Sequence, residues 1–227
     1  MSPTSPPAGR SGSEKGTTMT EVEWLACNDS ASMLTFLGTK RVCGRKGQLF
    51  VCSAARYYWT KLVDRRSQKA VEVSELFADD LATEQELREA QAEAGDAADS
   101  LAEFCVQGSP PSAEELWNAA ELAWEVASLY PNYLTKSFPN CIACLRDIFG
   151  NPFRPVALDP AWFRWNDGAI PRIAQAIYDE RRFADLPILA DALEEAGCTS
   201  ADILEHCRAE GEHVRGCWVV DLMLGKE

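Results

Sequence analysis

The chain lacks any long apolar run. Within its 227 residues the uninterrupted apolar stretches are short, such as Cys217–Val220 and Leu222–Leu224, whereas a membrane-spanning helix needs about 20 apolar residues. The first eighteen residues are mostly Ser, Pro, Gly and Thr, and they lack the core of roughly 7–15 apolar residues that a secretory signal requires. We therefore expect a cytoplasmic protein without a membrane segment. Residues 1–18 are expected to be a disordered tail, which makes Met19 an alternative start of translation.

Histidine is scarce, and nucleotide-binding motifs are missing. The two histidines, His206 and His213, both lie near the C-terminus, so a Ser/His/Asp triad would depend on a tertiary contact that the sequence does not reveal. Neither GxGxxG nor GxxxxGK[ST] occurs, although these are the common glycine-rich phosphate loops. No catalytic residue is predicted, and an enzyme is the less favoured interpretation.

Charge is unevenly distributed along the chain. The net charge of −13 disfavours general affinity for nucleic acid or anionic lipid. Residues 40–69 nevertheless hold nine bases and the single acid Asp64, with aromatic residues between them, and residues 72–103 hold eleven acids and the single base Arg88. A basic and aromatic stretch could bind nucleic acid, but an adjacent acidic helix would neutralise it. We favour pairing of the two stretches and keep nucleic-acid binding as an alternative.

Helical signals cover most of the chain, and no alternating strand pattern or internal repeat is present. The clearest helix spans residues 112–130, where Pro110-Pro111 precedes a capping box formed by Ser112 and Glu115. An all-α fold is therefore predicted. The other predicted helices span residues 44–63, 67–81, 83–105, 140–149, 168–182, 186–196, 200–209 and 216–224.

Prolines divide the chain into two parts. Pro152, Pro155 and Pro160 each disfavour helix at the preceding residue. We expect an irregular helical bundle over residues 19–149, a proline-rich connector over 150–166, and a small C-terminal helical unit over 167–227 packed on the bundle.

Cysteine is abundant. An odd number of nine cysteines, with no compact framework and no export signal, favours reduced thiols. Cys141 and Cys144 form a CxxC pair near a helix start, which a redox motif requires, but no strand precedes them. Dithiol chemistry is therefore an alternative to simple burial on a helix face.

Cysteine and histidine are concentrated near the C-terminus. Their side chains are suitable zinc ligands, but their spacing is not that of the usual ligand pairs. His206 and Cys207 are neighbours on a predicted helix and point about 100° apart, so at most one of them would bind a metal. A zinc site is an alternative to a packed corner of thiols and hydrogen-bonded imidazoles. The candidate ligands are Cys198, His206, Cys207, His213 and Cys217.

Aromatic residues follow the connector and return at the end of the chain. Exposed indoles at Trp162 and Trp165 would be costly for a monomer, and we expect Gly216 to allow a close approach of Trp218. These residues should form a buried joint between the connector and the closing helices; if exposed, they would form a partner groove. The joint is predicted to comprise Trp162, Trp165, Tyr178, Leu189, Leu193, Cys217 and Trp218.

Four stretches read MTEVEWLAC from Met19, DIFGNPFRPV from Asp147, LPILADALEEAGC from Leu186 and HVRGCWVVDL from His213. Together they resemble a family of uncharacterised bacterial proteins that occurs as many paralogues per genome. The resemblance extends from Met19 onward and implies that residues 1–18 lie outside the domain. It implies no activity, ligand or catalytic residue.

The function favoured by these patterns is a non-catalytic protein-interaction or scaffold module without a cofactor, because helical surfaces are plentiful and catalytic motifs are missing. One alternative is a metal- or thiol-dependent regulator that uses the C-terminal Cys/His cluster. The other is a nucleic-acid binder that uses residues 40–69.

Overall fold

The computed structural model describes residues 18–42, 44–106, 112–127 and 140–226. Within these ranges all regular structure is helical, with eleven α-helices, three short 3-10 helices and no strand. The prediction of an all-α fold is confirmed. No helix in this part of the chain is long and apolar enough to cross a membrane. The expected tail, apart from Thr18, and the side chains of the predicted capping box at Ser112 lie outside the described residues.

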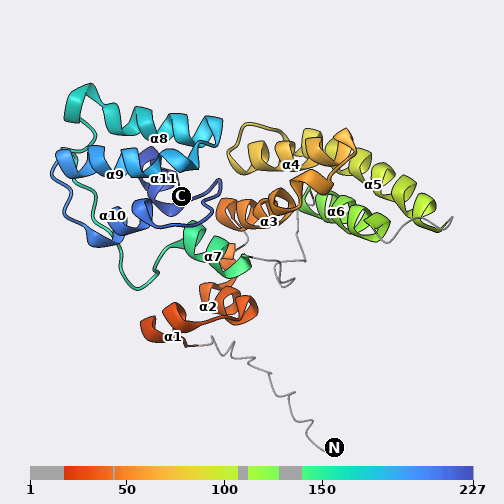
Figure 1. Cartoon of the computed structure of the whole chain (residues 1–227), viewed down its shortest axis with the longest axis horizontal. Helices are drawn as coiled ribbons and strands as arrows, with labels where there is room; N and C mark the ends of the chain where they lie inside the picture. The colour runs from red at the N-terminus through yellow and green to blue at the C-terminus, as the bar shows by residue number, and fades with distance from the viewer. Residues whose placement is uncertain (1–17, 43, 107–111, 128–139, 227) are drawn as a thin grey trace, which may run out of the picture.

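The N-terminal half supplies six α-helices. Four of them, α3 to α6, pack on one another, and Figure 1 shows them as one group on the right of the molecule. A 3-10 turn at Trp59–Lys61 joins α3 to α4, and the carboxylate of Asp64 caps α4 by accepting a hydrogen bond from the Arg66 amide. The helices are α1 (Glu21–Ala26), α2 (Ser30–Val42), α3 (Arg45–Tyr57), α4 (Arg65–Ala78), α5 (Glu84–Val106) and α6 (Ser112–Val126).

The C-terminal half supplies five α-helices and two 3-10 turns, Trp165–Asp167 and Phe183–Asp185. Helices α8 to α11 form a second group on the left of Figure 1, and α7 lies between the two groups, in contact with α3 and α11. The bounds are α7 (Cys141–Phe149), α8 (Ala169–Glu180), α9 (Leu186–Glu195), α10 (Ala201–Arg208) and α11 (Trp218–Leu224).

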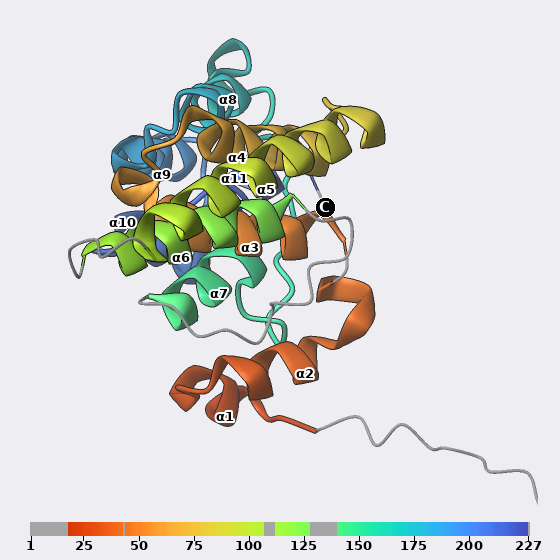
Figure 2. The same ribbon diagram turned by 90° about the vertical axis from the view of Figure 1, so that its right-hand side faces the viewer.

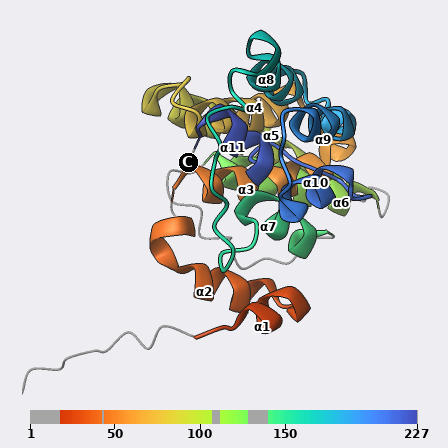
Figure 3. The same ribbon diagram turned by 90° about the vertical axis from the view of Figure 1, so that its left-hand side faces the viewer.

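Helices α1 and α2 form a short arm below α7 in all three views, away from α4 and α8 (Figures 1, 2 and 3). Thr20 and Glu23 start α1 with a capping box, and Trp24 is buried in the core beside α7. The Arg146 guanidinium on α7 donates to the carbonyl oxygens of Trp24, Leu25 and Cys27 at 2.8–3.1 Å. The Trp24 carbonyl also accepts from the Cys27 amide at 3.4 Å, and Arg146 adds side-chain partners for carbonyls at the end of α1, which a helix end leaves unsatisfied.

Two main hydrophobic cores lie on either side of α7. The first contains Trp24 and Phe50 together with Leu145 and Ile148 of α7. The second is built from α8 to α11 and contains most of the predicted joint. Within that joint Trp162, Tyr178, Leu189, Leu193 and Cys217 are buried, while Trp165 and Trp218 are partly buried against the same core.

The glycine beneath Trp218 is Gly150, so the expectation for Gly216 is wrong. A Cβ at Gly150 would lie 3.1 Å from Cγ of Trp218, whereas a Cβ at Gly216 would lie 3.0 Å from Cδ1 of Leu49. Gly216 therefore lets the C-terminal segment approach α3. Its φ is +95°, which residues with a Cβ rarely adopt.

The basic stretch makes ion pairs with acidic residues. Arg56 on α3 lies 2.7 Å from Glu75 on α4, and Lys69 on α4 lies 2.7 Å from Glu93 on α5. Pairing between neighbouring helices lowers the positive potential that this stretch would otherwise present to a partner.

Candidate metal centre

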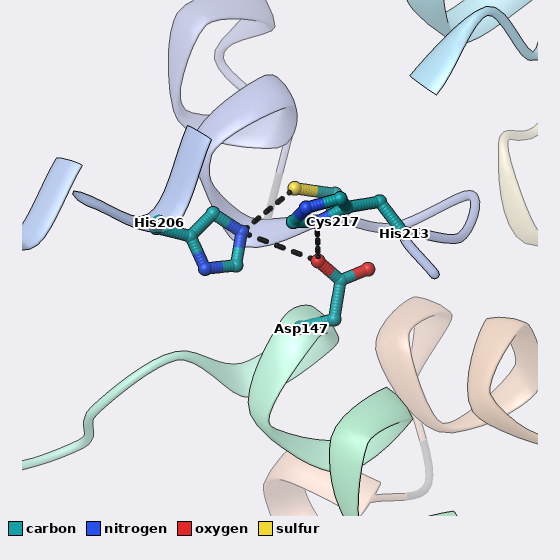
Figure 4. Close-up of side chains that lie close together, drawn as sticks. All are labelled: Asp147, His206, His213 and Cys217. Carbon is teal, nitrogen blue, oxygen red and sulfur yellow. Dashed lines mark hydrogen bonds and ion pairs between the residues drawn. The ribbon is translucent and has the colours of Figure 1, made fainter. Parts of the chain in front are cut away.

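Four side chains from distant parts of the chain meet between α7 and the C-terminal helices. Asp147 comes from α7 and His206 from α10, while His213 and Cys217 come from the segment that joins α10 to α11 (Figure 4). One donor atom of each residue lies within 4.8 Å of the donor atoms of the other three. Tertiary packing, and not a local sequence motif, therefore creates this cluster.

Asp147 is positioned by the buried face of α7. Cys144 and Ile148 lie on that face, and a residue three positions after Cys144 shares it. The carboxylate is consequently buried, with only 4% of Asp147 exposed. Its Oδ2 accepts a hydrogen bond from the Val214 amide at 2.8 Å, which fixes the segment from α10 to α11 against α7.

The imidazoles and the thiol converge on the other carboxylate oxygen. His213 Nδ1 lies 2.6 Å from Asp147 Oδ1, and His206 Nε2 lies 3.2 Å from the same oxygen. His206 Nε2 also lies 3.2 Å from Cys217 Sγ. The two imidazole rings meet edge to face, with centroids 4.9 Å apart. His213 Nε2 is buried and makes no hydrogen bond within the described part of the chain.

The surroundings shift the pKa values of the two acidic groups of the cluster in opposite directions. Burial by itself would raise the pKa of Asp147, but hydrogen bonds from His206 and His213 outweigh it and hold that pKa below its usual range. Burial raises the pKa of Cys217 well above its usual value, and the charge of Asp147 raises it further. A cation among these groups would reverse the effect on the thiol, because a coordinated thiol is deprotonated.

This geometry does not fit a nucleophilic triad. In a Cys–His–Asp arrangement the carboxylate orients one ring nitrogen while the other nitrogen activates the thiol. Here Asp147 and Cys217 both approach Nε2 of His206. One nitrogen cannot both donate its N–H to the carboxylate and accept the proton of the thiol, so general-base activation of Cys217 is not supported.

The donor set fits zinc. Zinc binds thiolate, imidazole and carboxylate, with Zn–N of about 2.0 Å and Zn–S of about 2.3 Å, which places tetrahedral donors roughly 3.3–3.6 Å apart. The two 3.2 Å separations at His206 Nε2 are close to these values. The shorter contact between His213 and Asp147 would need to lengthen by less than about 1 Å for both to become ligands.

The structure brings three of the five predicted ligands together. Only His206 of the adjacent pair His206–Cys207 reaches the cluster. Cys198 and Cys207 are instead buried in the second core, and burial raises the pKa of Cys207 to about 12. These two thiols behave as small apolar side chains, and their assignment as candidate ligands is corrected accordingly.

The CxxC pair lies on the buried face of α7. Cys141 and Cys144 form no disulfide and are only 2% and 4% exposed, and burial raises the pKa of Cys144 to about 11. No strand precedes α7 among the described residues. A high pKa and burial both oppose the exposed thiolate that dithiol exchange requires, so redox chemistry gains no support here.

Asp147 is the one member of the cluster that sequence reasoning missed. Its signal is an acidic side chain three residues after Cys144 and next to Ile148, on the apolar face of a short helix. An ionisable residue at such a position is seldom fully buried unless it has a partner. The partners of Asp147, however, are His206 and His213, which lie about sixty residues later in the chain.

Comparison of the chain with protein-family models, with curated proteins and with solved structures gives no significant match.

Proposed function

We propose that the protein is a non-catalytic helical module whose fold is completed by one zinc ion. The ligands are Asp147, His206, His213 and Cys217. The observation that carries this proposal is the convergence of a carboxylate, two imidazoles and a thiol, with donor atoms within 4.8 Å of one another.

A structural role suits the cluster better than a catalytic one. Four protein ligands fill the tetrahedral coordination of zinc, whereas catalytic zinc keeps one position open for water or substrate. Asp147 and Cys217 are also almost fully buried, as is usual for the ligands of a structural ion, although His213 lines a pocket.

The ion would join the two hydrophobic cores. Asp147 belongs to α7, whose apolar face lies in the first core, while Cys217 lies in the second. Zinc binding would therefore stabilise the packing of α10 and α11 on α7, and its loss would loosen the C-terminal helices. This behaviour is expected of a metal-dependent regulator whose surface is presented to a partner only in the metal-bound state.

The partner in this proposal is a protein, and the compartment is the cytoplasm. Support for a protein partner comes from the exposed apolar residues Val22 and Leu25 of α1, which are 76% and 53% exposed. Support for the compartment comes from the seven cysteines whose side chains the structure describes, none of which is in a disulfide. Nucleic-acid binding is the weaker candidate because Arg56 and Lys69 are paired with acids.

Elemental analysis of the purified, dialysed protein tests the proposal. We expect one zinc ion per chain in the wild type and a loss of zinc in Cys217→Ser and His213→Ala. Cys198→Ser is the matched control, because Cys198 is buried in the same core and lies outside the cluster. Its zinc content should be unchanged.

Reconstitution with cobalt(II) keeps the test independent of variants that fold poorly. In the wild type, cobalt bound in place of zinc should show the charge-transfer absorption of a thiolate ligand. A wild-type protein that is folded by circular dichroism but binds neither zinc nor cobalt would contradict the proposal.

A further inference from the structure

A second cluster, made of buried charged groups, lies between α3, α4, α8 and the C-terminal segment, and shares none of the four candidate ligands. One part of it is electrically balanced. Arg45 donates to Asp79 at 2.8 Å and to both carboxylate oxygens of Asp221 at 2.6 and 3.0 Å, and Lys226 lies 3.2 Å from Asp79. Two positive charges here face two negative charges. Tyr178 completes this part by donating to Asp79 and accepting from Arg45.

The other part of the cluster is not balanced. Glu75, whose side chain is 2% exposed, accepts hydrogen bonds from Arg56 at 2.7 and 3.0 Å and from Arg181. Arg215 lies 3.9 Å from the same carboxylate. Arg215 also lies 3.7 Å from Asp79 of the balanced part. The whole cluster therefore holds five basic and three acidic side chains among the described residues, an excess of two positive charges.

The arginines that carry the excess positive charge are partly buried. The side chains of Arg56, Arg181 and Arg215 are 21%, 32% and 13% exposed. Burial lowers the pKa of Arg181, and the charges of Arg56 and Arg215 lower it further against the opposing effect of Glu75. Arginine stays protonated in proteins, so this crowding is relieved by a negative partner and not by loss of a proton. Within the described chain Arg215 Nε makes no hydrogen bond.

A pocket lies among these four groups. It has a volume of about 200 Å³, and Arg56, Glu75, Arg181 and Arg215 all line it. It adjoins a larger pocket of about 750 Å³, which is within the range of about 300–1,000 Å³ typical of small-molecule sites. The residues that line both pockets are Ser53, Arg56, Arg181, Phe183, His213 and Val214. Apolar side chains of the larger pocket include Tyr57 and Pro187, and its acidic residues Glu210 and Glu212 lie on the segment after α10.

We propose that these joined pockets bind a small molecule that carries a dianionic phosphate group. The phosphate lies in the small pocket between the three arginines, and an apolar or aromatic remainder occupies the larger pocket. Two charges of a phosphate monoester match the excess of two positive charges, and the planar guanidinium fork suits phosphate oxygens. A carboxylate would neutralise only half of the excess.

The test uses the wild-type protein as purified and follows the side-chain Nε–Hε signals of arginine by NMR at constant ionic strength. Inorganic phosphate and phenyl phosphate should shift the signals of Arg56, Arg181 and Arg215 in a saturable way, with phenyl phosphate binding more tightly. Sulfate should compete because it is also dianionic, and acetate should bind much more weakly. The signal of Arg182 should not move, because Arg182 is 51% exposed and pairs with Glu180 and Asp185.

Two matched variants complete the test. Arg181→Gln should weaken phosphate binding by about tenfold, the loss expected for one charge-assisted hydrogen bond. Arg182→Gln removes the same charge one residue away and should leave binding unchanged. Equal effects of the two variants, equal affinity for acetate and phosphate, or no saturable shift in the wild type would each overturn the inference. Zinc content is measured on the same samples, so a protein that keeps its metal but ignores phosphate contradicts this inference alone.

Discussion

Gly150 and Trp218 meet where α7 ends and α11 begins. Gly150 has a φ of +63°, and a Cβ there would lie 3.1 Å from the indole. Gly150→Ala should lower the free energy of unfolding by about 1–3 kcal/mol, because backbone strain and crowding of the indole add together. Trp218→Ala should cost about 3 kcal/mol through lost packing on the second core.

A double-mutant cycle separates these two causes. In a Trp218→Ala background the crowding is gone and only the backbone strain remains, so Gly150→Ala should cost less there than in the wild type. Urea denaturation of the four proteins measures the difference. Strictly additive costs would show that the indole does not depend on the glycine.

At the scale of residues, the sequence predicted which side chains can bind a metal better than it predicted where those side chains lie in the fold. His206, His213 and Cys217 were identifiable as candidate ligands because few side chains can bind zinc. Cys198 and Cys207 lie outside the cluster, and the sequence could not separate them from the others, since a buried apolar thiol and a ligating thiol look the same in one sequence. Asp147 was missed because its partners depend on how the C-terminal segment packs on α7.

Arg146 connects α7 to the end of α1, and its loss should affect α1 most. Its guanidinium holds three carbonyls at the end of α1. Arg146→Ala should speed amide hydrogen exchange in α1 and its flanking residues while leaving α8 and α9 protected, because α1 is only six residues long and cannot persist alone. Arg164 is exposed, and the control substitution Arg164→Ala should change hydrogen exchange neither in α1 nor in α8 and α9. Uniform loss of protection across all helices would contradict this local role.

Helix positions were largely predictable, because caps, glycines and prolines act locally. The predicted helix at 186–196 corresponds to α9 at Leu186–Glu195, and the one at 140–149 to α7 at Cys141–Phe149. Helices α1 and α2 were not predicted. The first is short, and the second is interrupted at Gly38, whose φ is +72° and ψ is +161°. Burial of Trp24 against α7 supports the first of them, and that contact is tertiary.

The buried charges between the two helical groups should shape the acid stability of the whole molecule. Burial would raise the pKa of Asp79, but hydrogen bonds from Tyr178 and Arg45 outweigh it and lower that pKa, and the charge of Lys226 adds to this effect. Arg215 lies 3.7 Å away. A lowered folded-state pKa means that the stability is present above about pH 4 and is lost as pH falls toward the folded value.

Asp79→Asn should therefore lower stability at pH 7 and flatten its decline below about pH 4. Asp221 is a matched acidic residue whose pKa is shifted in the opposite direction, because burial raises that pKa more than Arg45 lowers it. Asp221→Asn should make the decline steeper. Urea denaturation across this pH range compares the three proteins, and an unchanged acid limb in Asp79→Asn would refute the assignment.

The whole molecule consists of two helical cores that meet at α7 and are bridged by two polar clusters. One cluster holds donors suited to a metal, and the other holds an excess of positive charge beside a pocket. The sequence indicated the two cores through the proline-rich connector. It indicated three residues of the first cluster but not Asp147, and it could not indicate the second, because that cluster draws residues from both halves of the chain.

X-ray absorption at the zinc edge of the purified protein tests the central claim most directly. A site formed by Asp147, His206, His213 and Cys217 predicts one sulfur at about 2.3 Å and three nitrogen or oxygen atoms at about 2.0–2.2 Å. A first shell without sulfur, a shell with several sulfurs, or a folded protein that binds no zinc would contradict the account.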